Sequence, residues 1–200
     1  MKCLLGYYSP NNGRSLKSIG RLLGKEDEKV VYPVQIATVF SDLGLEVKYH
    51  SCYDLEGFLG MSADRRKDEY VRYYGENAEL LLRHTDIPVL ESHIRSALEK
   101  GIVVKEPLDF DLLKENCWNG YSAICLINAD LYCNRENKYN GHYIVLTDIT
   151  ECGVSYHEVG PVGAVPNKEV SRNKFMDMWN KVCFFDENTV FVKPKSVLGV

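Results

Sequence analysis

The sequence predicts an α+β fold in which a helical first half packs against an antiparallel sheet formed by the second half. Two patterns carry this prediction. Between residues 15 and 101 the apolar residues recur every three or four positions, as in helices that bury one face. Beyond residue 102 they gather in short β-prone runs separated by turns. No repeat or low-complexity linker divides the 200 residues, so we expect one domain spanning residues 1–200.

Four helical segments are expected in the first half. The first covers residues 15–23, carries its leucines and Ile19 on one face, and ends at Gly24. Pro33 fits the first turn of a second helix, which Gly44 ends. The other two helical segments cover residues 68–84 and the stretch from about residue 88 to Gly101.

The second half is expected to form the sheet, together with two short helices. Asp109 caps a helix over residues 110–116, and Ser171 caps one that buries Phe175, Met178 and Trp179. The largely apolar run 122–128 has the pattern of a central strand. The remaining strands are expected at residues 102–104, from Gly141 onward, and at residues 154–158 and 189–192.

Composition and charge narrow the class of protein. A net charge of −4 argues against a broad nucleic-acid surface, and no apolar run approaches the roughly 20 residues that span a bilayer. The N-terminal apolar run is too short for a signal peptide. The seven cysteines form no C-x-x-C pair, so we expect no metal, no cofactor and a reducing compartment. We therefore expect a cytoplasmic protein without nucleic-acid or membrane partners.

The stretch Gly141-His142-Tyr143-Ile144-Val145-Leu146 is the most informative in the chain. It places a histidine at the head of an apolar strand, and a turn then leads to a second strand that ends at Glu158. Such a hairpin can set a general base, His142, beside an orienting acid, Glu158. His157 is expected on the opposite face because side chains alternate along a strand. Both site residues have a plainer interpretation, as polar side chains at strand ends.

The ordered set of motifs resembles the C39-like peptidase family, which has a papain-like cysteine peptidase fold. The resemblance rests on Asn12-Gly13-Arg14-Ser15-Leu16, Leu43-Gly44-Leu45, the His142 strand, Tyr156-His157-Glu158 and the Phe175-x-x-x-Trp179 helix. It covers nearly the whole chain. It implies thiol peptidase chemistry and a cleft between the helical half and the sheet that takes a peptide or small amide.

This sequence departs from the family pattern at the nucleophile. Asn12 stands where the family has its cysteine, and no glutamine precedes it to support an oxyanion. An amide side chain is no nucleophile for hydrolysis, although Asn12 suits a turn or helix cap. The acid is Glu158 rather than Asp or Asn. The resemblance therefore indicates a catalytically degenerate domain that binds a peptide or amide ligand.

The alternative is an active thiol hydrolase or acyl transferase that uses a relocated cysteine with His142. Cys52 is the first candidate because it lies near His50 and just before Asp54, a possible helix cap. Cys117 is weaker because the carboxyl end of a helix raises a thiol pKa. Cys3 is expected to be buried in a strand and inert.

Overall fold

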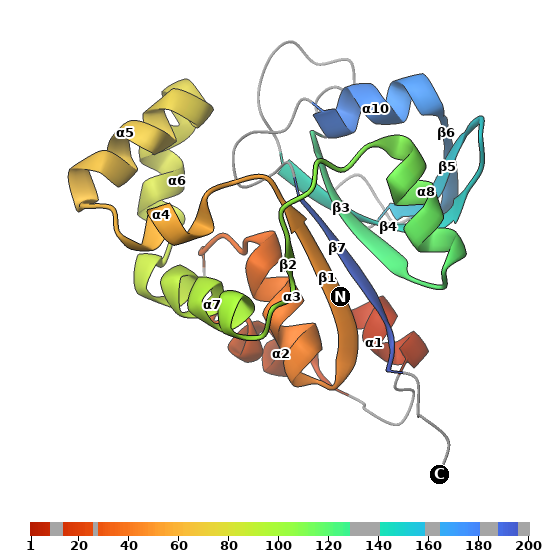
Figure 1. Ribbon diagram of the computed structural model, residues 1–200, viewed down its shortest axis with the longest axis horizontal. Helices are drawn as coiled ribbons and strands as arrows, with labels where there is room; N and C mark the ends of the chain where they lie inside the picture. Colours follow the sequence, from red (N-terminus) through yellow and green to blue (C-terminus); the bar gives the residue numbers. More distant parts are fainter. Residues whose placement is uncertain (9–13, 26–27, 129–140, 159–164, 181–187, 196–200) are drawn as a thin grey trace.

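The computed structural model describes residues 1–8, 14–25, 28–128, 141–158, 165–180 and 188–195 (Figure 1). These residues form a mixed α and β structure around a seven-stranded, mostly antiparallel sheet. The α+β class predicted from the sequence is confirmed at this level. Asn12 lies outside the described residues, as do Cys133, Cys183 and the side chain of Cys3.

Helices α4 to α7 of the first half lie together on one side of the molecule, away from α8 and α10 of the second half (Figure 1). None of the helices in the described part of the chain is both long and apolar enough to cross a membrane. The helices are α1 (Lys2–Tyr8), α2 (Leu16–Leu22), α3 (Pro33–Asp42), α4 (Leu55–Leu59), α5 (Ala63–Tyr74), the 3-10 turn η1 (Gly75–Asn77), α6 (Ala78–His84), α7 (Ile87–Glu99), α8 (Phe110–Trp118) and α10 (Arg172–Asn180).

The seven strands run in the order β2-β1-β7-β3-β4-β5-β6. They are β1 (Leu45–Ser51), β2 (Val103–Val104), β3 (Ser122–Asn128), β4 (Gly141–Ile149), β5 (Gly153–Glu158), β6 (Val165–Ser171) and β7 (Asn188–Pro194). The β1–β2 pair is parallel and the other pairs are antiparallel. The expected central strand, β3, occupies the middle position, and the expected edge strand, β2, lies at one edge.

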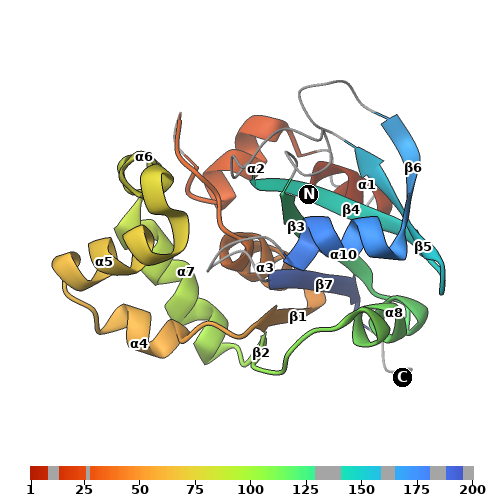
Figure 2. The same cartoon turned by 90° about the horizontal axis from the view of Figure 1, so that it is seen from above.

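Side-chain alternation along the strands gives the sheet two buried faces. On one face Tyr49, Ile124 and Val190 pack against α1, α2, α3 and α7. On the other face Cys125, Ile144 and their neighbours pack against α8 and α10. Helices therefore cover both faces, as the turned view shows (Figure 2).

Four elements differ from the sequence prediction. Strand β1 lies inside the half expected to be helical, and β6 occupies part of the segment expected to be a loop. Cys3, expected in a strand, belongs to helix α1. The helical segment expected at residues 68–84 starts at Ala63 and is interrupted at Gly75, whose φ of 53° favours glycine.

Candidate functional site

The hairpin of β4 and β5 brings His142 and Glu158 together. Val145 pairs with His157, so Glu158 lies diagonally across the hairpin from His142. The imidazole Nε2 lies 2.7 Å from a carboxylate oxygen of Glu158, and the two side chains are 18% and 12% exposed. The Lys168 ammonium lies 3.6 Å from the other oxygen. Glu158 can therefore orient the ring in the way that the sequence suggested.

The His142 imidazole lies on the sheet face covered by α8 and α10. His142 pairs with Ile127 of β3, which belongs to the core on that face. Tyr143, the next residue, belongs to the opposite face and packs with the core under α3. His157 lies on this opposite face too, as predicted, and receives a 3.4 Å hydrogen bond from the backbone N–H of Asn167.

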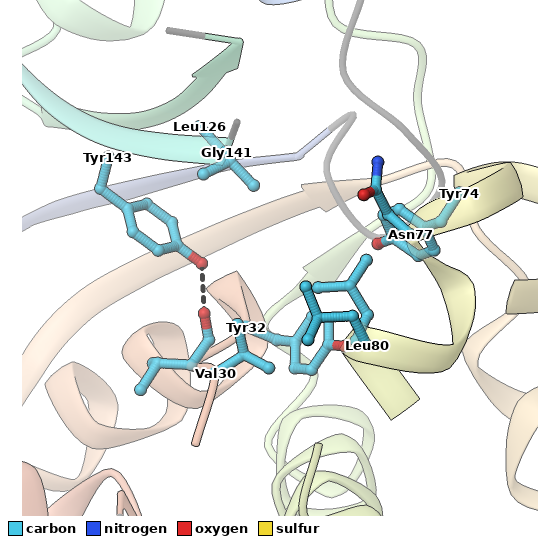
Figure 3. Close-up of a pocket in the computed structure, with 10 residues that line it drawn as sticks. Val30, Tyr32, Tyr74, Asn77, Leu80, Leu126, Gly141 and Tyr143 are labelled. Carbon is cyan, nitrogen blue, oxygen red and sulfur yellow. Dashed lines mark hydrogen bonds between the residues drawn. The ribbon is translucent and has the colours of Figure 1, made fainter. Parts of the chain in front are cut away.

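A cleft of about 260 Å³ lies between the helices and the sheet, at the start of β4 (Figure 3). Tyr143, rather than His142, forms its sheet wall. The Tyr143 hydroxyl donates a 2.8 Å hydrogen bond to the carbonyl oxygen of Val31, just before α3. Burial raises the pKa of Tyr143 well above its ordinary value, so the phenol stays a donor. The lining residues are Val30, Val31, Tyr32, Tyr74, Asn77, Leu80, Leu81, Leu126, Gly141 and Tyr143.

Buried hydrogen bonds hold the helical wall of the cleft in place. Tyr32 is the residue that caps α3, and its backbone N–H donates to the side-chain oxygen of Gln35 at 2.7 Å. Its hydroxyl lies 2.9 Å from the hydroxyl of Tyr70 and 2.8 Å from that of Thr85. This network ties α3 to α5 and to the residue after α6, so the wall is largely preformed.

Cys52 lies just beyond the end of β1 and is exposed. In the sheet, β7 and β3 separate β1 from β4. At about 4.8 Å between neighbouring strands, the β1 and β4 backbones are roughly 14 Å apart. A thiol and an imidazole must come within hydrogen-bond reach to act as a pair, and strands at this separation do not bring them there.

The other described cysteines lack the surroundings of a thiolate. Burial raises the pKa of Cys117 to about 12 and raises that of Cys125 as well. The expected direction for Cys117 is thus correct, although burial is the cause rather than the helix terminus. Cys152 is exposed in the β4–β5 turn, at the other end of β4 from His142.

Among the described residues, no three His, Cys, Asp or Glu side chains are grouped so as to hold a metal ion. Comparisons of the chain with protein-family models, curated proteins and solved structures found no match. The site is therefore interpreted from its own geometry.

The cleft residues were not singled out by the sequence, except for the Gly141 and Tyr143 positions of the His142 motif. They come from the segment before α3, from the stretch between the end of α5 and α6, and from two strands. Leu80 could have been noticed only in part. The sequence shows an apolar residue in a helical segment, whereas its 54% exposure at the rim of the cleft is visible only in the structure.

Proposed function

We propose that this chain is a papain-like, C39-like domain that binds a short peptide or small amide without hydrolysing it. The observation that carries the proposal is the cleft between the helical part and the sheet. The family resemblance places a ligand site between these two parts of the fold. The His142–Glu158 pair, which the resemblance also implies, lies on the other face of the same sheet.

The chemistry of the cleft suits an amide ligand with an apolar side chain. The walls are mostly aliphatic and aromatic, which favours burial of an apolar group. Asn77 adds a side-chain amide, which can both donate to and accept from a peptide group. A ligand with one apolar group and an adjacent amide therefore matches both kinds of surface.

Two observations favour binding over hydrolysis. Asn12, at the family's nucleophile position in the sequence, offers no thiolate, and without one no acyl-enzyme forms. The His142 imidazole lies on the sheet face opposite Tyr143, so a ligand held beside Tyr143 is out of its direct reach. The alternative thiol hydrolase would need Cys52 to approach His142 across two intervening strands.

The test is a titration of ¹⁵N-labelled protein with N-acetyl-leucinamide, followed by backbone amide chemical shifts. Binding in the cleft is expected to move the signals of Asn77, Leu80 and Gly141 and to leave the β4–β5 turn unchanged. Leu80→Asp is expected to abolish the shifts because it puts a charge on the apolar rim. Val71→Asp is the matched control, since Val71 is 50% exposed on α5 and does not line the cleft.

Two results would count against the proposal. Shifts that survive Leu80→Asp would move the ligand away from the cleft. Hydrolysis of the probe to ammonia and N-acetyl-leucine, or to acetate and leucinamide, would favour the relocated-cysteine hydrolase instead if it is lost in Cys52→Ala and in His142→Ala.

A further inference from the structure

A second hollow lies where the sheet has a gap at the start of β3. Ser122, the first residue of β3, pairs with Val192, but β7 continues to Pro194. On the other side β4 continues to Ile149, beyond its last pairing with β3 at Val145. Beyond these pairings β7 and β4 have no paired strand between them, and two strand spacings make this gap about 10 Å across. We call this gap the sheet notch.

The sheet notch opens into a hollow of about 800 Å³, the size of a small-molecule site. Residues from both sheet faces reach it, because no strand closes the gap: Val145 and His157 from one face, Tyr121 and Leu146 from the other. Gly120 also lines it, and a Cβ at this position would meet nothing within 4 Å. Along β3, the notch lies about 14 Å from the cleft, four residues away between Ser122 and Leu126.

Aromatic rings line the sheet notch. Tyr7 and Tyr8 of α1 form an edge-to-face pair with ring centroids 5.0 Å apart, and Tyr7 is 77% exposed. Tyr121, in the link between α8 and β3, also lines the hollow. The adjoining smaller hollow shares Tyr121 and adds Trp118, which is 66% exposed. Tyr121 is only 6% exposed, so the rings open to a ligand are those of Tyr7 and Trp118. An exposed ring on a concave surface favours a flat aromatic ligand, which gains stacking contacts as well as burial.

Positive charge next to the hollow favours an anion, and the two lysines that carry it flank Tyr121 without lining the hollow themselves. The ammonium groups of Lys48 and Lys193 lie 4.7 Å and 4.2 Å from the centroid of the Tyr121 ring. The Glu46 carboxylate lies 3.4 Å from the Lys193 ammonium and offsets one of the two positive charges. It also accepts a hydrogen bond from the Tyr121 hydroxyl. No described residue lining the larger hollow is a carboxylate. Ser122 and Tyr8, whose hydroxyls lie 2.6 Å apart, add hydroxyl groups at the wall.

We propose that the sheet notch is a binding site for a small aromatic anion. The exposed ring of Tyr7 contacts the flat part of the ligand, and the buried Tyr121 forms part of the wall. The lysine pair beside Tyr121 favours the negative charge of the ligand. This site goes beyond the peptide or amide cleft and does not depend on it.

The test compares two fluorescent probes that differ chiefly in one sulfonate, 8-anilinonaphthalene-1-sulfonate and uncharged N-phenyl-1-naphthylamine. The anionic probe is expected to bind with one equivalent per chain and more tightly than the neutral probe. Tyr7→Ala is expected to weaken it about fivefold, the loss of one ring contact. Because Tyr7 is exposed, this variant keeps the fold. Lys193→Gln is expected to reduce the ratio of the two probe affinities, anionic over neutral, about threefold. Added salt is expected to reduce the same ratio, because it screens the charge.

Leu80→Asp and Val71→Asp serve as controls, at the rim of the cleft and on a distant helix respectively. Both are expected to bind the anionic probe as the parent chain does. The proposal is overturned if Tyr7→Ala and Lys193→Gln bind the probe like the parent chain. It is also overturned if Leu80→Asp alone removes binding, because the probe then occupies the cleft.

Discussion

The hydrogen bond from Tyr143 to Val31 is the contact that most directly joins the sheet to the helical wall of the cleft. Tyr143→Phe removes the hydroxyl and leaves the ring, so packing is kept and one donor is lost. The Val31 carbonyl oxygen is then left without this donor at a half-buried position. A buried acceptor left unpaired costs about 1–3 kcal/mol, and the partial exposure of Val31 favours the lower part of that range, about 1–2 kcal/mol.

Urea denaturation followed by circular dichroism measures this loss. The midpoint is expected to fall while the slope of the transition is unchanged, because the surface exposed on unfolding is the same. In a chain of this length each kcal/mol lowers the melting temperature by about 2–4 °C. Tyr7→Phe is the matched control, since its exposed ring makes it neutral to within about 0.5 kcal/mol. If Tyr143→Phe is as stable as the control, the hydrogen bond does not hold the cleft walls together.

Three further predictions follow from other parts of the structure. Burial lowers the pKa of His50 and of His93, so these two side chains take up protons at a higher pH in the unfolded chain than in the folded one. Their contribution to the free energy of unfolding is complete above about pH 6.5 and is lost as the pH falls towards the folded pKa values. The loss is at most about 1.4 kcal/mol per pH unit for each histidine. Urea midpoints between pH 7.5 and 5 measure this slope, which His50→Phe is expected to reduce; an unchanged slope would contradict the role of His50. Gly24→Ala is expected to destabilise more than Gly101→Ala, because both glycines have φ near 63° but only at Gly24 would the new Cβ meet Val89, at 2.5 Å; equal melting temperatures would show that Val89 gives way. Iodoacetamide is expected to label Cys52 and Cys152 before Cys117 and Cys125, because the first pair is exposed while Cys125 is buried and Cys117 has a raised pKa; mass-spectrometric mapping checks the order, and early labelling of Cys125 would contradict its burial.

The parts of the fold that depend on local sequence were predictable. The α3 and α7 helices, the central strand β3 and the His142–Glu158 hairpin all follow from periodicity and turns within short segments. Glu158 reaches His142 because only 16 residues and one turn separate them. This pair could therefore be placed before the structure was known, although the face on which its imidazole lies relative to the cleft could not.

The parts that depend on distant contacts were not predictable. The segment Lys2–Tyr8 combines apolar and aromatic residues in a strand-like way, yet it forms helix α1 over the sheet. Strand β6 carries Pro166 and mostly exposed polar residues, which its position at the sheet edge permits. The cleft joins segments that lie up to 113 residues apart, from Val30 to Tyr143, so no local motif reports it.

The most direct test of the central claim, binding without hydrolysis, is affinity selection from a mixture of N-acetylated tripeptide amides, analysed by mass spectrometry. The parent chain is expected to retain intact members that carry an aliphatic or aromatic side chain, and Leu80→Asp is expected to retain none of them. Cleaved members in the parent sample that are absent with His142→Ala would contradict the claim, and so would equal retention by Leu80→Asp.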